Sequence, residues 1–244
     1  MRAWLNLRYT VPERREAFKQ GLSRLGYKTH DGFPDHPKDG DLLLTWNRIG
    51  MGDTAARRFA NAGCPVIVAE NASWGNDFLG ERWYTLARNY HNTAGMFPIG
   101  DNAVMCSFAD SGRWDSLGVD LPAWRTSGET VLLAQRGIGA GIPQGWTERA
   151  AAEHGARIRR HPGTREAIPL ETDLANAGKV VTWGSGAAIK ALLMGIPVVS
   201  YMPAWIGEQD NTDAGRLAMF RRLAWAQWTL DEVREGAPFR WLLQ

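Results

Sequence analysis

Cysteine, net charge and long apolar runs are all scarce in this sequence. Its 244 residues contain two cysteines, Cys64 and Cys106, whose spacing is not that of metal ligands, so we expect reduced thiols and neither a disulfide framework nor a zinc site. Lys and Arg number 28 and Asp and Glu 26, and this near balance neither requires nor excludes a nucleic-acid partner. No run approaches the roughly 20 apolar residues of a membrane span, and the first residues have no signal-peptide core. These absences predict a cytoplasmic protein without a membrane partner.

The rest of the composition is that of a folded globular protein. Apolar residues make up 44% of the chain and charged residues 22%, which is sufficient for a packed core. A chain of 244 residues forms one large domain or two small ones. The 12 tryptophans are a high count, and we expect most of them in cores, with some left to stack on a base or a sugar ring.

Strand and helix patterns alternate through the first half of the chain. The strands are continuous apolar runs, which indicates a parallel sheet covered by helices on both faces. The stretch after the third strand is less regular and is rich in Gly, Asn, Trp and Asp. The predicted elements are strands at 2–9, 41–46, 65–70 and 83–88 and helices at 12–25 and 54–62.

The second half repeats the alternation and ends in a long amphipathic pattern. We predict an α/β fold with a domain at 1–126, a second at 127–212 and a C-terminal helical segment at 213–244 that packs back on the first domain. The predicted elements of the second half are strands at 130–135, 179–183 and 198–201, a short strand that ends at 160–162, and helices at 147–154, 187–194 and 213–235.

The most informative local feature is the turn Gly184-Ser185-Gly186 between an apolar strand and a helix. A turn of small residues leaves backbone N–H groups at the helix start without intrahelical partners. Such groups, together with the helix dipole, form an anion site, and phosphate is its commonest occupant. The turn therefore predicts a ligand that carries phosphate.

Motifs around this turn resemble the nucleotide-sugar domain of GT-B glycosyltransferases. They are His161-Pro162, the runs at 173–177 and 180–186, and the run at 191–199. The tail at 221–232 also looks like the C-terminal motif of phage-encoded glycosyltransferase-like proteins. The strong part of the resemblance covers about a third of the chain. One departure is Lys190, where many relatives carry a Glu that contacts the ribose.

The resemblance implies two Rossmann-like domains that face each other across a cleft. It also implies an enzyme without a permanently bound cofactor that transfers a sugar from a nucleotide diphosphate sugar, with UDP-glucose as the first donor to consider. The phage-like tail implies 5-hydroxymethylcytosine in duplex DNA as the acceptor, inside a bacterial host cell, and a base in a duplex must be flipped out to reach a donor pocket. A polysaccharide or small-metabolite acceptor, and a non-catalytic nucleotide-binding protein, remain as alternatives.

Donor contacts are expected where the strands of the second half end. Ligands of open α/β sheets bind at the carboxyl ends of the strands, and the forked donors of arginine match phosphate oxygens. The run that contains Gln209 lies after the last strand, where similar proteins contact the sugar. Trp183 is either a wall of the donor pocket or a core residue. The predicted donor-binding residues are Arg136, Arg160, His161, Trp183, Gly184, Ser185, Gly186, Gln209 and Asp210.

The catalytic base is expected in the first half. Transfer with inversion needs a carboxylate or a histidine to take the proton of the acceptor hydroxyl. Glu70, at the end of a predicted strand, is the first candidate, and Asp101 and His91 follow. The predicted acceptor contacts are Asn71, Arg88 and Asn89.

No obligatory metal is expected. The run Asp39-Gly40-Asp41 spells a metal-binding pattern but directly precedes a strand, so we interpret it as a turn. A helix dipole and arginine side chains can balance the charge of the leaving group instead. Three arginine pairs, at 14–15, 57–58 and 221–222, are interpreted as solvated helix faces, and two of them along one side of a cleft would form a nucleic-acid track.

Overall fold

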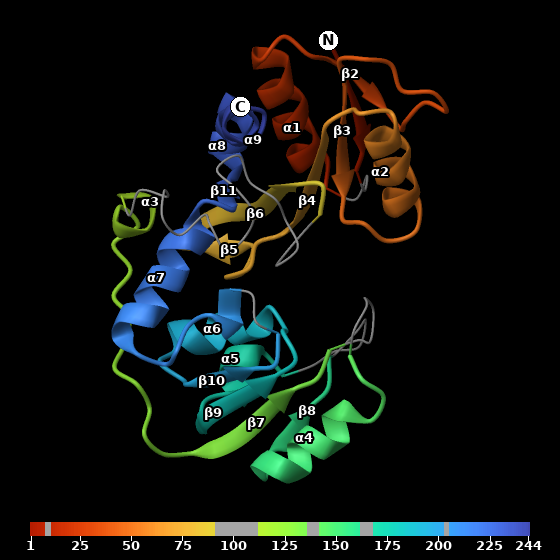
Figure 1. Cartoon of the computed structure of the whole chain (residues 1–244). Coiled ribbons are helices and arrows are strands. Elements are labelled where there is room, and N and C mark those ends of the chain that lie inside the picture. Colours follow the sequence, from red (N-terminus) through yellow and green to blue (C-terminus); the bar gives the residue numbers. More distant parts are fainter. Residues whose placement is uncertain (8–10, 91–111, 136–141, 162–167, 203–204) are drawn as a thin grey trace. The chain divides into compact units, whose positions relative to one another are not determined.

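The computed structural model describes residues 1–7, 11–90, 112–135, 142–161, 168–202 and 205–244. The chain divides into two compact units (Figure 1). Unit 1 comprises Met1–Asp110 and Arg222–Gln244, and unit 2 comprises Ser111–Arg221. Within the described ranges, no helix is both long enough and apolar enough to cross a membrane.

Unit 1 contains a mixed sheet with the strand order β11-β6-β4-β3-β1-β2. The four strands from β4 to β2 are parallel, as the sequence predicts, whereas β6 and β11 run antiparallel to their neighbours and β5 pairs with β6. The short strand β2 was not predicted, because its sequence Lys-Thr-His-Asp is polar and only partly buried. The strands are β1 (Arg2–Asn6), β2 (Lys28–Asp31), β3 (Asp41–Trp46), β4 (Val66–Asn71), β5 (Asp77–Phe78), β6 (Glu81–Arg88) and β11 (Gln227–Thr229).

Helices cover both faces of the unit 1 sheet. The side chains of Leu43, Val66 and Val68 pack against α2 (Met51–Asn61) on one face. On the other face, Tyr84 contacts Phe18 of α1 (Pro12–Arg24) through their rings. Figure 1 shows α1 and α2 on opposite sides of the sheet. This arrangement follows from the apolar residues on both sides of β3 and β4.

The predicted continuous helix at 213–235 is wrong. The chain forms α7 (Asp213–Ala224), then strand β11, then α8 (Leu230–Glu235) and α9 (Ala237–Leu242). The break occurs because β11 joins the sheet beside β6, where the buried side chain of Gln227 accepts hydrogen bonds from the Ser73 N–H and the Thr85 hydroxyl. Thr229 then starts α8 with a capping box that involves Glu232. The helical periodicity of the sequence does not show that a short segment within it pairs with a distant strand instead.

Unit 2 contains a fully parallel sheet with the order β10-β9-β7-β8. Helix α4 packs on Leu132 and Val181 on one face, and Figure 1 shows α5 and α6 on the other. The elements of unit 2 are α3 (Gly112–Asp115), β7 (Glu129–Leu133), α4 (Trp146–His154), β8 (Arg157–Arg159), α5 (Leu170–Asp173), β9 (Ala177–Thr182), α6 (Ala187–Leu193), β10 (Val198–Ser200) and the 3₁₀ turn η3 (Trp205–Gly207).

Substitution of Gly21 by alanine tests the packing of α1 on the C-terminal helices. A Cβ at Gly21 would lie 2.0 Å from the carbonyl oxygen of Val233 and 2.7 Å from the ring of Phe239. Overpacking of this kind costs about 1–3 kcal/mol, so Gly21→Ala lowers the urea midpoint of unfolding measured by tryptophan fluorescence. Ser23→Ala, on the exposed side of the same helix, is the control and shifts stability by less than about 0.5 kcal/mol. An unchanged midpoint for Gly21→Ala would contradict this packing.

Candidate functional site

The topology of each sheet marks one place at its carboxyl edge where a ligand can enter. In unit 2, β7 connects to β8 on one side while β9 connects to β10 on the other, so the switch point lies between β7 and β9. In unit 1, the same reasoning places the switch point between β1 and β3. The connections leave in opposite directions there, and open α/β sheets generally bind their ligands outside the carboxyl ends of the strands at such a point.

Thr182 organises the switch point of unit 2. This buried residue is the last of β9 and pairs with Leu133, the last of β7. Its hydroxyl donates to the Leu133 carbonyl at 3.3 Å and accepts from the N–H groups of Gly184 and Ser185 at 3.2 and 2.9 Å. A hydroxyl offers one donor and two acceptor sites, so all three are used. Thr182 therefore joins the two strands and shapes the turn that follows.

The predicted phosphate turn offers fewer amides than its sequence suggests. The Ser185 N–H points back to Thr182, and the Ser185 hydroxyl accepts from the Ala187 N–H at 3.3 Å. The Gly186 N–H makes no hydrogen bond to another described residue. Helix α6 has seven residues, so its dipole is short. Of the groups in this turn, the Gly186 N–H is the one that an anion would meet.

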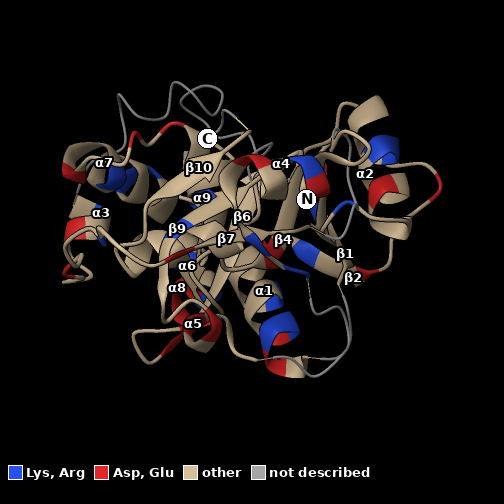
Figure 2. Ribbon diagram, turned by 90° about the horizontal axis from the view of Figure 1, so that it is seen from below, with Lys and Arg blue, Asp and Glu red and all other residues tan. Residues whose placement is uncertain are grey.

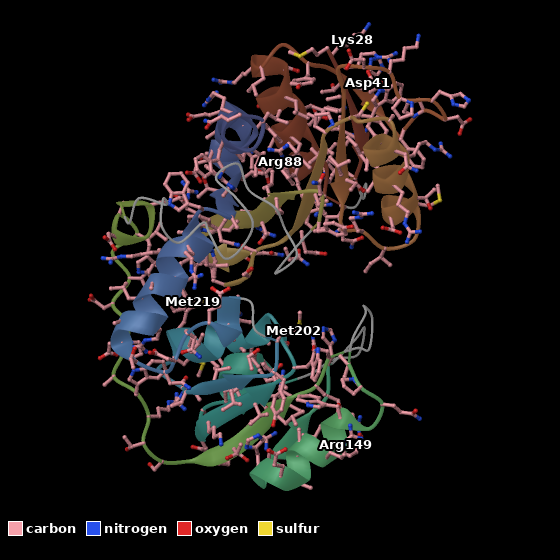
Figure 3. All side chains as sticks on the ribbon, in the orientation of Figure 1. Lys28, Asp41, Arg88, Arg149, Met202 and Met219 are labelled. Carbon is pink, nitrogen blue, oxygen red and sulfur yellow. The ribbon has the colours of Figure 1, made fainter. Side chains whose placement is uncertain are left out.

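Close packing fixes the first glycine of this turn. A Cβ at Gly184 would lie 2.6 Å from the sulfur of Met202, which follows β10 in the chain and is labelled in Figure 3. Glycine is thus needed here so that the end of β10 can approach the turn. The ends of β9 and β10 consequently form one continuous rim.

Aromatic residues lie beside this rim. The ring of Trp183 stacks on that of Tyr201, with centroids 6.2 Å apart, and Trp146 meets both rings edge-on. The Tyr201 hydroxyl lies 3.0 Å from Nε2 of His154, and burial together with the nearby Glu153 carboxylate raises the pKa of Tyr201. Trp183 packs against the core of unit 2 yet is only half-buried, so it serves the core while part of it faces solvent.

Arg160 and His161 follow β8, the edge strand, and lie one strand away from the switch point. Both are exposed, and Arg160 approaches Glu148 at 3.5 Å. The arginines of β8 itself have a structural role, because Arg159 and Arg157 both bind Asp173 of the motif at 173–177. This clamp fixes the end of β8 before the chain reaches the rim.

Other residues singled out in the sequence lie elsewhere or are already paired. Gln209 is buried, and its side-chain amide donates to the Val198 carbonyl at the start of β10, the amino end of that strand. Asp210 accepts from the N–H and hydroxyl of Thr212 just before α7. Lys190 donates to Glu171 at 2.5 Å, which lowers the pKa of that carboxyl group. The structure therefore does not bring Gln209, Asp210 or Lys190 to the rim beside Thr182.

Three predicted site residues lie outside the described residues. They are Arg136, His91 and Asp101. In the described ranges, no group of three or more His, Cys, Asp and Glu side chains is placed to hold a metal ion. Asp41 of the Asp-Gly-Asp run is buried and receives two hydrogen bonds from the Arg2 guanidinium, both at 2.8 Å.

The carboxyl edge of unit 1 is polar. At its switch point, the Asn6 amide donates to the buried Thr45 hydroxyl at 3.0 Å. Asn47 follows β3 in a left-handed conformation, with φ of 53°, and its N–H donates to the Ala69 carbonyl. Glu70, the next residue of β4, is half-buried and accepts from the Asn71 N–H at 2.8 Å. An amide, a hydroxyl and a carboxylate from three neighbouring strands thus share this edge.

The predicted acceptor residues do not all lie together. Glu70 and Asn71 end β4, but β6 runs antiparallel, so Arg88 pairs with Ile67 and the Asn89 N–H donates to the Val66 carbonyl at the start of β4. Arg88 and Asn89 instead line a cavity of 410 Å³ at the amino end of that strand. The structure separates the two pairs along the length of β4.

Sequence reasoning missed Thr182, Gln135, Asn6 and Thr45. Each is a polar residue at or next to the end of an apolar strand, and that signal was available. Gln135 follows β7 and has a buried side-chain oxygen without a hydrogen-bond partner in the described structure. What the sequence could not supply was the strand order that selects these strand ends among all the others.

Comparisons with known proteins show the fold. No protein-family model and no curated protein matches the chain. Among solved structures, the beta Kdo 2,4 transferase KpsC of Thermosulfurimonas dismutans has a TM-score of 0.55 at 13% identity, covering 92% of this chain and 91% of its own. A periplasmic ribose ABC transporter of Conexibacter woesei has a TM-score of 0.26 at 13% identity, covering 82% of this chain and 72% of its own. An aspartate transcarbamoylase of Trypanosoma cruzi has a TM-score of 0.27 at 14% identity, covering 91% of this chain and 80% of its own. Those two scores are too low to support an argument, whereas the first shows an α/β fold similar to that of a sugar transferase.

The clamp at Asp173 predicts a stability difference that depends on pH. Burial alone would raise the pKa of Asp173, but hydrogen bonds and charge from Arg159 and Arg157 outweigh it, so the pKa lies below its ordinary value of 3.8. The stabilisation is therefore complete above about pH 3.8 and is lost as the pH falls through the lower folded-state pKa. Asp173→Asn costs about 1–2 kcal/mol at pH 7 in urea unfolding, because Arg157 is partly exposed, and the cost disappears in acid.

Asp120→Asn is the matched control for this measurement. Asp120 is an exposed carboxylate of the same unit, and its removal leaves the unfolding midpoint unchanged both at pH 7 and in acid. A cost of Asp173→Asn that persists undiminished below the folded-state pKa would show that the charge of Asp173 is not its source.

Proposed function

We propose that the protein is a glycosyltransferase that moves a sugar from a nucleotide sugar to a hydroxyl acceptor. The observation that carries the proposal is the pairing of two α/β units, each with a polar switch point, in a fold that resembles a sugar transferase along nearly the whole chain. In this proposal, unit 2 binds the donor and unit 1 binds the acceptor. A fold alone does not determine which reaction a protein catalyses, so the proposal also depends on the residues at the strand ends.

The strand ends of unit 2 are suited to a nucleotide. The Gly186 N–H is available to a phosphate oxygen, and Arg160 and His161 add exposed nitrogen donors on the same edge of the sheet. The buried oxygen of Gln135 costs free energy as long as it has no partner, and a ribose hydroxyl or a base N–H would satisfy it. The half-buried ring of Trp183 offers an apolar wall.

Glu70 is the proposed catalytic base. Its carboxylate takes the proton of the acceptor hydroxyl while that oxygen forms a bond to the anomeric carbon of the donor sugar. The bond between the anomeric carbon and the diphosphate oxygen breaks, and the nucleoside diphosphate leaves with that electron pair. Asn6, at the end of β1 on the same edge of the sheet, is suited to hold a further acceptor hydroxyl.

The distribution of charge favours a saccharide acceptor over DNA. Most arginines of the three basic pairs already have acidic partners: Arg15 binds Asp31, Arg57 binds Asp53, Arg58 binds Asp35 and Arg221 binds Asp115. Arg14 is buried, with its guanidinium 3.8 Å from the centre of the Trp46 ring. Figure 2 shows blue and red segments side by side on α1 and α2. A DNA track needs uncompensated cations, whereas a carbohydrate needs amides, hydroxyls and carboxylates.

The activity is tested with a panel of nucleotide sugars that includes UDP-glucose, offered with oligosaccharides or with hydroxymethylcytosine DNA. We expect nucleotide release and a mass increase of an oligosaccharide. A mass increase of nucleosides digested from the DNA would instead establish the DNA acceptor and overturn the saccharide. Absence of transfer and of donor hydrolysis with every donor would reject the enzyme and leave a nucleotide-binding protein.

The role of Glu70 is tested by Glu70→Gln. Removal of a general base typically costs 10²–10⁴-fold, so kcat falls by about that factor while KM for the donor stays close to the wild-type value. Glu81→Gln, at an exposed carboxylate of β6, is the matched control and retains full activity. A Glu70→Gln enzyme with normal kcat would assign the base to another residue.

A further inference from the structure

Asn47 is the first residue after β3, at the carboxyl edge of the unit 1 sheet. Trp46, the last residue of β3, pairs with Ala69 of β4. Continuing this register by one residue places Asn47 beside Glu70. The Asn47 N–H donates to the Ala69 carbonyl at 2.9 Å, and the Thr45 hydroxyl lies 3.5 Å from the Asn47 carbonyl oxygen. The backbone of Asn47 is therefore held between β3 and β4, next to the proposed base.

The first turn of α2 packs tightly on this strand end. A Cβ at Gly52 would lie 2.6 Å from the Asn47 carbonyl oxygen and 3.1 Å from the Thr45 hydroxyl oxygen. The left-handed backbone of Asn47, with φ of 53°, starts the loop that leads into α2. Contacts with the sheet and with the helix thus fix the position of this residue.

The side-chain amide of Asn47 makes no hydrogen bond to any residue that the structure describes, although Asn47 is only 6% exposed. Its oxygen and nitrogen are not fully enclosed, in contrast to the side-chain oxygen of Gln135 in unit 2. Because Asn47 lies past the end of β3, solvent reaches this amide at the carboxyl edge of the sheet. A polar group without a partner in a nearly buried residue costs free energy, and a ligand that pairs with it recovers that cost.

The left-handed backbone does not by itself account for this amide. Within the described ranges, the non-glycine residues with positive φ are Asn47, Leu79, Asn89 and Asn211. The amide of Asn211 is fully used, since its oxygen accepts from the Val198 N–H at 2.8 Å and its nitrogen donates to the Val198 carbonyl at 3.1 Å. The side chain of Asn211 therefore serves the fold by pairing the edge of β10, whereas that of Asn47 is available to a ligand.

The groups at this edge favour an uncharged ligand that is rich in hydroxyl groups. An amide offers a donor and an acceptor, and hydroxyl groups use both. An anion would accept from the amide nitrogen alone and would lie beside the Glu70 carboxylate, which repels it. Asn6 adds a second amide at the end of β1, with its nitrogen bonded to Thr45 at 3.0 Å. This chemistry matches a neutral saccharide.

We propose that Asn47 binds hydroxyl groups of an uncharged acceptor saccharide beside Glu70 and thereby selects the acceptor. The inference rests on the proposed function for its choice of a saccharide acceptor. It adds a binding residue that takes no part in the proton transfer itself.

The same substitution at two asparagines tests the contrast between their amides. Asn47→Gly leaves the urea midpoint of unfolding unchanged, because glycine adopts the left-handed backbone and no side-chain hydrogen bond is lost. Asn211→Gly is the matched comparison and lowers the midpoint, because the hydrogen bonds to Val198 are lost. A midpoint for Asn47→Gly that falls as far as that of Asn211→Gly would show that the amide of Asn47 is structural and would overturn the proposal.

Binding is measured by NMR titration of the isotope-labelled full chain without any nucleotide sugar, so the result does not depend on transferase activity. The probes are the neutral sugars maltotriose, cellotriose and mannotriose and the anionic sugar trigalacturonate. The side-chain amide signal of Asn47 is identified by its loss in Asn47→Gly. We expect this signal to shift with at least one neutral trisaccharide, and Asn47→Gly to weaken that binding about tenfold.

The proposal is wrong if no neutral trisaccharide shifts the Asn47 signal, or if trigalacturonate binds as tightly as the neutral sugars. In the active enzyme, Asn47→Gly raises KM for the acceptor and leaves kcat and KM for the donor close to the wild-type values. An unchanged KM for the acceptor would overturn the role of Asn47 and leave the transferase itself in place. Absence of transfer with every donor would instead reject the proposed function, and the titration would still decide whether Asn47 binds a saccharide.

Discussion

The hydroxyl group of Thr182 is the interaction on which the candidate donor site depends. One side chain links β9 to β7 through the Leu133 carbonyl and accepts the first two N–H groups of the following turn. Because the residue is fully buried, water does not compete for these bonds. These bonds hold the turn against the end of β9, and the amide left for a ligand is that of Gly186. A preorganised site of this kind loses little conformational entropy on binding.

Unit 1 contains a counterpart of this arrangement. Thr45, near the end of β3, is also fully buried, and its hydroxyl accepts from the Asn6 side chain and lies 3.5 Å from the Asn6 carbonyl oxygen. In both units a threonine therefore connects the two strands that flank the switch point. Polar side chains are placed at these strand ends because the ladder hydrogen bonds stop there and the last backbone groups need other partners. The polar side chains that satisfy the last backbone groups of the sheet therefore also lie where a ligand would bind.

Much of the fold could be predicted from sequence, and the site only in part. The strand at 41–46 was predicted with its observed bounds, because a continuous apolar run between turns has few alternatives. The strand at 227–229 was missed because its pairing with β6 bridges more than a hundred residues of sequence. Arg88 was predicted as an acceptor contact together with Asn71, but the antiparallel direction of β6 places it at the other end of β4. The sequence shows which polar side chains follow each strand, but it does not show the order or the direction of the strands.

The spatial distribution of charge likewise cannot be predicted from the sequence alone. A near-zero net charge is compatible with an even mixture of ions or with separate basic and acidic surfaces, and these differ in the partners they attract. Here the basic pair of α2 is matched locally, since Asp53 binds Arg57 within the helix and Asp35 binds Arg58 from a preceding loop. Such exposed pairs add little stability, but they cancel the field that would attract a polyanion.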